Sequence, residues 1–435
     1  MESSFDLTTL ALVVVAALGC GLLLIRLRQP VVVGYIVAGV ILGPSVLGLV
    51  DDREQVSLIA ELGVLLLLFV IGLELDLRAF RRVYQVAVLT MLLQALSSVA
   101  IMLLLSHLLG WSMGLAILIG FSFALSSTAV AIKMLEDTGE LNSDAGRITV
   151  GVLIAQDLAV IPMLLIVGGL AGGGYSISTL FKLLLAVGVL AVLIRYLSNR
   201  DDPLDVPLLR RLDGNTDIAV LAAVAGCFAI AALAGLAGLS PAYGAFLAGM
   251  FFGNTKHGST MLKAALPVQS LFIAAFFLSI GLLIDLQFIW DNLLHVIVLL
   301  LLVTVVKTVV DVGILRLLGQ PWPRAFFIGV VIGQIGEFSF LLVATGTANG
   351  IVDQEANRLL IAVIALSLVI SPLWFSIAKR LQQLAAQSGG GIGGIRPILH
   401  EVVIHQRRTT RLYVYIARRR LRVLRHPHHP LRPRR

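Results

Sequence analysis

The sequence predicts an all-α polytopic membrane protein with about thirteen transmembrane helices. Three features lead to this fold class: composition, a series of apolar runs, and an internal repeat. Of the 435 residues, 58% are hydrophobic and 13% are charged, and the mean hydropathy is +0.97. A soluble protein of this length cannot bury so much apolar surface, so lipid must be the solvent for most of the chain.

Thirteen apolar runs follow one another along the chain, and most are long enough to cross a bilayer as a helix. The ninth run is short and is expected to be partly re-entrant. The runs cover residues 5–25, 31–50, 56–75, 85–106, 112–134, 148–170, 177–197, 216–236, 239–253, 267–286, 289–315, 325–346 and 357–378.

Basic residues are distributed unevenly between the loops. Fifteen Lys and Arg residues follow odd-numbered runs, whereas three follow even-numbered runs. Cytoplasmic loops carry an excess of Lys and Arg, so the odd loops are predicted to be cytoplasmic. The N-terminus is then outside and the C-terminus is in the cytoplasm. Merging the eighth and ninth runs would destroy this alternation.

Three pairs of segments match in the same order at an offset of 209 or 210 residues. Matching units lie seven runs apart, an odd number, so they are predicted to have opposite orientations in the membrane. Inverted repeats are typical of secondary transporters, which bind substrate near the midplane between the repeats. The pairs are GYIVAGVILGP (34–44) with GAFLAGMFFGN (244–254), IGLELDL (71–77) with IGLLIDL (280–286), and LIGFSFALSSTAVAI (118–132) with FIGVVIGQIGEFSFL (327–341).

The repeat divides the chain into parts. A transmembrane domain is expected over residues 1–384, with repeats at about 5–170 and 216–378 and a linker helix at 177–197. Residues 385–435 are expected to form a Gly-rich hinge and a basic cytoplasmic tail.

Two matching runs are predicted to be broken near their middle. LSSTAVAI (125–132) has three hydroxyl residues in a row, and IGQIGEFSF (332–340) has two glycines beside polar residues. Hydroxyl side chains divert helix hydrogen bonds, and Gly weakens a helix by about 1 kcal/mol relative to Ala. Unwound backbone at membrane depth requires a protein or water-filled surrounding, so two crossing broken helices are expected. The alternative is that these small residues allow close helix packing. The residues expected at the breaks are Ser127, Thr128, Gly333, Gly336 and Glu337.

Asp157 is the principal candidate for a transport site. It lies in GVLIAQDLAVIPMLLIVGG (151–169), about ten residues into its run and therefore roughly 15 Å along a helix. Without a cation, a carboxylate held away from water favours its protonated form, so cation and proton would compete. Gln156 would add a neutral carbonyl ligand, and Pro162 would free a backbone carbonyl. A structural ion pair is the alternative.

Further ionisable residues lie in apolar runs. Lys307 needs a partner, and Asp157 or Asp311 are the candidates. Pairing with Asp157 would be a coupling device, whereas pairing with Asp311 would steady the helix. Glu337 is expected to have a structural or ion-path role, and Glu74 is expected to contribute to the entry path.

Six segments resemble Kef-type members of the monovalent cation:proton antiporter family. They occur in the same order and at family-like separations, over about residues 10–380. The segments are GYIVAGVILGPSVLG (34–48), ELGVLLLLFVIGLELD (61–76), SSTAVAIKMLEDTGEL (126–141), GVLIAQDLAVIPML (151–164), LSPAYGAFLAGMFFGN (239–254) and GQIGEFSFLL (333–342).

The resemblance implies a sodium/proton antiporter-like fold with a scaffold or dimer domain and a core domain. In the core, two unwound helices cross beside an essential Asp, which Asp157 matches, with Gln156 before it. Lys307 matches a basic residue of the core. The crossed helices are matched by Ser127, Thr128 and the segment Gly333–Glu337. Relatives are typically homodimers that move like an elevator.

The Gln-Asp pair resembles the potassium-selective Kef subgroup, whereas electrogenic sodium relatives resemble Asp-Asp. One carboxylate fewer favours electroneutral exchange, unless Lys307 also carries a proton. The expected substrates are therefore a monovalent cation bound at Asp157, with K⁺ favoured over Na⁺, and H⁺.

The C-terminal region departs from the family. Kef-type proteins commonly continue into a nucleotide-binding regulatory domain, but only forty residues follow the Gly-rich stretch 388–395. From Lys379 onward there are fourteen basic residues and one acidic residue, a charge of +13. This tail is either attracted to anionic lipid or is a disordered, truncated or frame-shifted remnant. It has no fold for specific nucleic-acid binding.

The sequence therefore predicts an antiporter of the bacterial inner membrane. A gated cation channel without proton coupling and a sensor that has lost transport are the alternatives. No enzyme and no cofactor are expected, because no nucleophile elbow, P-loop or G-x-G-x-x-G is present. Cys20 and Cys227 lie in apolar runs, so no disulfide or thiolate metal site is expected.

Overall fold

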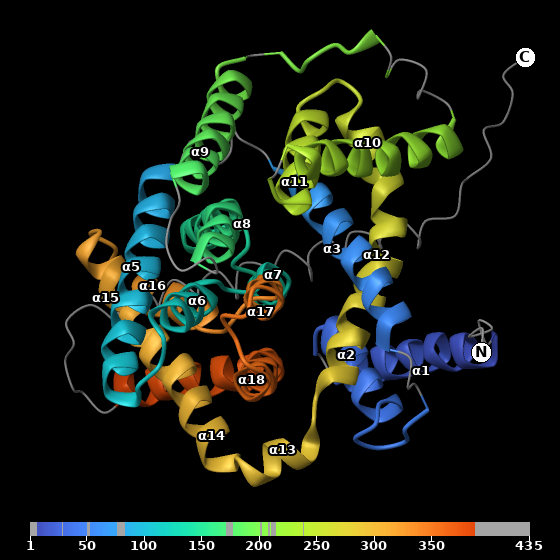
Figure 1. Cartoon of the computed structure of the whole chain (residues 1–435). Helices are drawn as coiled ribbons and strands as arrows, with labels where there is room; N and C mark the ends of the chain where they lie inside the picture. The colour runs from blue at the N-terminus through green and yellow to red at the C-terminus, as the bar shows by residue number, and fades with distance from the viewer. Residues whose placement is uncertain are drawn as a thin grey trace, which may run out of the picture.

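The computed structural model describes residues 7–27, 29–49, 53–75, 83–170, 177–200, 202–207, 209, 215–237 and 239–387. These residues form helices, together with one parallel bridge between Leu204 and Thr255 (Figure 1). The helices are α1 (Leu7–Arg26), α2 (Val31–Leu42), α3 (Arg53–Glu74), α5 (Tyr84–Leu109), α6 (Met113–Ala124), α7 (Thr128–Thr138), α8 (Asp144–Leu170), α9 (Ile177–Ser198), α10 (Thr216–Leu236), α11 (Pro241–Gly253), α12 (Gly258–Leu283), α13 (Leu286–Asp291), α14 (Leu293–Leu301), the π-helical turn η2 (Leu302–Val306), α15 (Lys307–Leu317), α16 (Trp322–Val331), α17 (Phe338–Ala348) and α18 (Gln354–Gln387).

The all-helical membrane fold is confirmed. Every predicted apolar run overlaps at least one helix, and seven helical stretches of the described chain are long and apolar enough to cross a membrane. Shorter apolar helices include Val31–Leu42, Trp322–Val331 and Phe338–Ala348. Thirteen crossings therefore stay a prediction. The predicted Gly-rich hinge and basic tail lie outside the described residues from position 388 onward.

The helices form two groups, which Figure 1 shows side by side. One group contains α1–α3 and α10–α12, and the other contains α5–α8 and α14–α18. Helix α9 lies against α8 and α11, where the Tyr243 hydroxyl donates to the Ala186 carbonyl at 2.8 Å. We call these groups the six-helix group and the break-containing group.

In the six-helix group, helices of one sequence repeat pack against helices of the other. Helix α2 packs on α12, and α11 packs on α3, so each short helix contacts a long helix of the other repeat. A Cβ on Gly39 would lie 2.8 Å from Gly281 Cα, and a Cβ on Gly249 would lie 3.0 Å from Gly72 Cα. These matched glycines allow backbone to pack on backbone, which explains why the repeat retains Gly at both positions.

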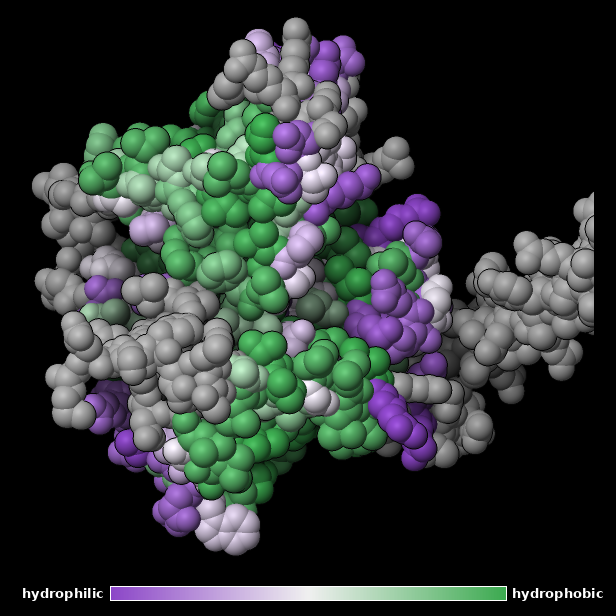
Figure 2. All heavy atoms as spheres, turned by 90° about the vertical axis from the view of Figure 1, so that its right-hand side faces the viewer, coloured by the Kyte–Doolittle hydropathy of each residue, from purple (hydrophilic) through white to green (hydrophobic). Residues whose placement is uncertain are grey.

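The outer surface is apolar over a broad area. The face formed by the α1, α10 and α12 side of the molecule is covered mainly by hydrophobic residues, and hydrophilic residues gather toward its edges (Figure 2). On α1, the side chains of Val15, Leu18 and Leu22 are each more than half exposed. An apolar band of this kind fits a protein whose solvent is lipid.

Candidate functional site

Helices α6 and α7 are separated by a short extended segment, Leu125–Ser127. The Ser127 hydroxyl accepts a hydrogen bond from the Val130 amide and so caps the start of α7. The Ser126 hydroxyl donates instead to the Ile332 carbonyl, 206 residues away in sequence, at 2.7 Å. The three predicted hydroxyls therefore do break the helix, and Thr128 is the first residue of α7.

The second break, residues 332–337, lies against the first. The Gly336 amide donates to the Leu125 carbonyl at 3.0 Å. The Gln334 side chain closes a double bridge, because its Oε1 accepts from the Ser127 amide at 2.7 Å and its Nε2 donates to the Ser127 carbonyl at 3.1 Å. A Cβ on Gly336 would meet Ser126 backbone at 2.6 Å, so Gly is required here.

Lys307 binds both breaks at once. Its Nζ donates to the Leu125 carbonyl at 2.8 Å, to the Ser126 hydroxyl at 3.0 Å and to the Gln334 carbonyl at 2.8 Å. The side chain is 6% exposed. Among the described residues, no ion pair within 4.0 Å includes Lys307, so neither of its two candidate partners, Asp157 and Asp311, forms a direct pair with it. Its charge is held instead by carbonyls freed at the breaks, which sequence spacing does not reveal.

The π-helical turn that orients Lys307 was not predicted from the sequence. The five residues before it, Leu302–Val306, form a π-helical turn, and Lys307 is the first residue of α15. A π-helical turn holds one more residue than an α-helical turn, so it rotates the following side chains around the axis. This rotation aims Lys307 at the two breaks.

Asp157 lies beside the first break, in the middle of α8. Its side chain is 5% exposed, and the Thr128 hydroxyl donates to Oδ2 at 3.2 Å. Glu337 and, more weakly, Glu74 act on it electrostatically. Within the described chain, no Lys, Arg or His lies within 4.0 Å of this carboxylate. Asp157 is therefore a buried acid with a hydroxyl partner, acidic neighbours and no bound counter-charge.

Glu337 ends the second break. It is 8% exposed, and its Oε2 has no hydrogen-bond partner among the described residues. Gly333, at the other end of this break, packs closely against the hydroxyl of Thr308. Pro162 lies inside α8, which continues through it without a break.

Gln156 holds the first break to the helix bundle. Its Oε1 accepts from the Ser126 amide at 3.0 Å, and its Nε2 donates to the Ala124 carbonyl at 3.1 Å and to Gln94 Oε1 at 2.9 Å. Gln94 Nε2 then donates to Asp311 Oδ1 at 2.8 Å. The carbonyl of Gln156 thus already has a donor, and its role as a cation ligand stays a prediction. Gln94 was not predicted, although an amide in an apolar run was a signal for it.

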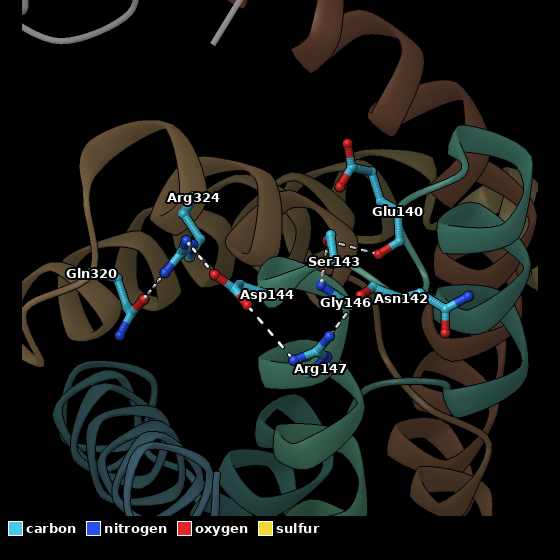
Figure 3. A network of polar contacts seen from close by, with 8 residues as sticks. All are labelled: Glu140, Asn142, Ser143, Asp144, Gly146, Arg147, Gln320 and Arg324. Carbon is cyan, nitrogen blue, oxygen red and sulfur yellow. Dashed lines mark hydrogen bonds and ion pairs between the residues drawn. The ribbon is translucent and has the colours of Figure 1, made fainter. Parts of the chain in front are cut away.

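The end of the break-containing group where α8 and α16 begin carries a surface network (Figure 3). Arg324 Nη2 lies 3.1 Å from Asp144 Oδ2, and Arg147 Nη1 lies 4.0 Å from Asp144 Oδ1. The same turn is closed by Ser143, whose hydroxyl donates to the Glu140 carbonyl. Exposed pairs of this kind contribute about 0–1 kcal/mol each, so they orient the start of α8 more than they stabilise it.

A cavity of about 230 Å³ lies where α3, α9 and α11 end. Its polar lining includes Glu74, Arg200, Asp202 and Asn254. Glu74 both lines this cavity and acts electrostatically on Asp157, although the two belong to different helix groups.

The structure therefore brings most of the predicted site residues together. They surround one crossing of two unwound segments, near the middle of an apolar helix bundle. In the described part of the chain, no group of three or more His, Cys, Asp and Glu residues is arranged to hold a metal ion. The residues gathered at the crossing are Ser127, Thr128, Gln156, Asp157, Lys307, Gly333, Gly336 and Glu337.

A polytopic helical protein with two crossed helix breaks and a buried carboxylate belongs structurally to the secondary transporters. The family model described as "Sodium/hydrogen exchanger, transmembrane" matches residues 12–378. The chain belongs to this family of cation/proton antiporters, and it is a transporter rather than an enzyme.

The names of similar proteins differ in the ion that they give as the transported substrate. The chain is 47% identical over 381 residues to "Iron transporter MagA" of Paramagnetospirillum magneticum, covering 88% of this chain and 87% of that protein. It is 33% identical to "K(+) efflux antiporter 5" of Arabidopsis thaliana, covering 86% of this chain and 66% of that protein. It is 31% identical to "Glutathione-regulated potassium-efflux system protein KefC" of Klebsiella pneumoniae, covering 82% of this chain and 58% of that protein. The chain thus spans less than two thirds of these two potassium transporters.

The fold matches a solved antiporter. The sodium proton antiporter MjNhaP1 from Methanocaldococcus jannaschii superimposes with a TM-score of 0.66, covering 86% of this chain and 98% of that one. The sequence identity is 16%, so this comparison supports the fold alone. The predicted sodium/proton antiporter-like fold is confirmed.

Proposed function

We propose that the protein exchanges a monovalent cation, with K⁺ favoured, for H⁺ by alternating access. The observation that carries this proposal is Asp157, a buried carboxylate with Thr128 as its hydroxyl partner and no counter-charge within 4.0 Å in the described chain. Such a group is stable when it binds either a proton or a cation, and it cannot hold both well. Competition between the two for one carboxylate couples their movements.

The surroundings of Asp157 support the proposal. Thr128 supplies a hydroxyl, and Glu337 supplies a carboxylate atom without a partner in the described chain, so oxygen ligands are available for a dehydrated cation. Ser127 and Gln156 hold the unwound backbone that faces the site. Two crossed half-helix ends also present backbone dipoles to an ion.

The preference for K⁺ rests on the residue before the Asp. Gln156 contributes no second charge, unlike the Asp-Asp pair of the electrogenic sodium exchangers that this chain resembles less. Two named relatives are K⁺ efflux proteins. Na⁺/H⁺ exchange is the second candidate, and the family description favours it.

The remaining residues have supporting roles in this proposal. Lys307 joins the two breaks, so it fixes the shape of the site and balances part of its negative charge. Gly333 and Gly336 allow the close crossing, and Pro162 shapes α8. The cavity beside Glu74 is an ion entrance.

The proposed arrangement in the cell rests on the distribution of basic residues and on the family resemblance. We place the protein in the bacterial inner membrane, with its N-terminus outside and its C-terminus in the cytoplasm, as a homodimer. Residues 1–384 form the transport domain, in which the break-containing group moves against the six-helix group. Residues 385–435 are assigned to a Gly-rich hinge and a basic cytoplasmic tail, either a remnant of a nucleotide-binding regulatory domain or a segment attracted to anionic lipid.

The test uses purified protein in liposomes that contain a pH-sensitive dye. Gradients of K⁺, Na⁺ and, separately, Fe²⁺ are imposed with the membrane potential clamped, and wild type is compared with Asp157→Asn. Asp285→Asn is the matched control, because Asp285 caps α13 at the surface. The proposal predicts K⁺-driven proton movement that is lost in Asp157→Asn and retained in the control.

Each other outcome has a definite meaning. A larger response to Na⁺ than to K⁺ would make Na⁺ the favoured cation. A response to Fe²⁺ alone refutes monovalent exchange. Cation flux without proton movement identifies a channel. Exchange that persists in Asp157→Asn removes Asp157 from the mechanism.

A further inference from the structure

Asp311 is a buried carboxylate that the proposed exchange does not use. It lies on α15, one turn after Lys307, and is 1% exposed. Its two oxygens differ: Oδ1 accepts from Gln94 Nε2 at 2.8 Å, whereas Oδ2 has no hydrogen-bond partner among the described residues. A buried carboxylate oxygen without a donor is costly unless it takes up a proton or another ligand.

The amide chain that reaches Asp311 has a fixed direction. The Ser126 amide must find an acceptor and the Ala124 carbonyl a donor, so Gln156 has only one orientation that satisfies both. Gln156 then presents N–H to Gln94, which must use its own carbonyl to accept it. Gln94 is left with its amide group toward Asp311, so Oδ1 has to remain an acceptor.

This direction determines where a proton can enter. A proton on Oδ1 would face the N–H donor of Gln94, whereas a proton on Oδ2 leaves the amide chain unchanged. Thr90, one turn before Gln94 on the same face of α5, also has a buried hydroxyl without a partner in the described chain. Two neighbouring turns of α5 thus carry polar groups in a bilayer-buried region.

The charged groups around Asp311 are few. On its own helix, Lys307 acts on it electrostatically. Helix α5 contributes the neutral Gln94, η2 has no charged residue, and the charged residue of α16, Arg324, pairs with Asp144 at the surface. Protonation of Asp311 would therefore remove the carboxylate that balances Lys307, and Lys307 holds both helix breaks.

We infer that Asp311 is a second proton-binding site of the transporter, with Oδ2 as the proton acceptor, connected to the first helix break by Gln94 and Gln156. This inference rests on the proposed function, because it assigns the pH response of exchange to a group other than Asp157. A cavity of about 20 Å³ beside Lys307, lined by residues of α5, α6, η2 and α15, is large enough for about one water molecule, and Val310, the residue before Asp311, is part of its lining.

The test combines infrared spectroscopy and flux on the full chain in liposomes. Asp311→Asn keeps the size of the side chain and an acceptor for Gln94, but it cannot titrate. Infrared difference spectra between high and low pH should contain a protonated-carboxyl band that is lost in Asp311→Asn and retained in Asp157→Asn. The exchange rate of Asp311→Asn should lose one titration step of the wild-type pH profile while transport continues.

A second variant distinguishes a specific effect on Asp311 from a general folding defect. Gln94→Met removes the donor to Oδ1 without removing the carboxylate, so it should move the midpoint of the Asp311 band rather than abolish it. Asp285→Asn should leave the band and the profile unchanged. Wild-type exchange with no Asp311-dependent band and an unchanged profile in Asp311→Asn refutes the inference alone. Absence of exchange by wild type refutes the proposed function instead, while the infrared band is still measured.

Discussion

Replacing Lys307 by Met tests whether this side chain holds the crossing together. The change removes three hydrogen bonds of 2.8, 3.0 and 2.8 Å. The Leu125 carbonyl keeps the Gly336 amide as a donor, but the Gln334 carbonyl loses the Lys donor. A buried carbonyl left without a donor costs about 1–3 kcal/mol. Loss of the positive charge that acts on the buried carboxylate of Asp311 adds to this cost.

The expected result is a marked loss of thermal stability in detergent. One kcal/mol corresponds to about 2–4 °C in a domain of 150–250 residues and to less in a larger one, so a fall of a few degrees is expected. Lys263→Met is the matched control, because this Lys is exposed on α12 and should change stability by less than about 0.5 kcal/mol. Size-exclusion chromatography after heating gives the melting midpoint of each variant. If the melting midpoint of Lys307→Met equals that of Lys263→Met, Lys307 does not stabilise the crossing.

Three other substitutions test the packing. Gly249→Ala should lower the melting midpoint, because overpacking against the α3 backbone costs about 1–3 kcal/mol, whereas Gly313→Ala, with open space around its Cβ, should leave it unchanged or raise it. Tyr243→Phe should cost about 1 kcal/mol in the same assay, since it removes a buried 2.8 Å bond to α9, and an unchanged midpoint would argue against that contact. Arg324→Ala should change stability by less than about 1 kcal/mol, because its pair with Asp144 is exposed, and a large effect on melting would contradict that estimate.

The fold was predictable because lipid imposes simple rules on sequence. Long apolar runs must be helices, and unwound backbone must be covered by protein. The residues Ser126–Thr128 and Gly333–Glu337 were identified as breaks because their side chains disfavour a helix interior. The overlay of the two repeats also paired them correctly, since both breaks meet in one crossing.

The partners across the crossing were not predictable. Lys307 was expected to face a carboxylate, but it binds carbonyls that become free only after both helices unwind. The Gln94–Asp311 contact joins residues 217 positions apart, and neither residue belongs to a matched pair of the repeat. Sequence periodicity predicts which residues share a helix face. It does not predict which distant helix packs against that face.

The π-helical turn before Lys307 decides which way this side chain faces. A five-residue turn arises when one residue is inserted into an ordinary helix, so Leu302–Val306 has the form of a retained insertion. If the same five residues were wound as a regular α-helix, Lys307 would turn by about 100° relative to α14. This change of winding removes no polar group from the crossing. It would nevertheless turn the Lys307 ammonium away from the two breaks while α15 itself stays intact.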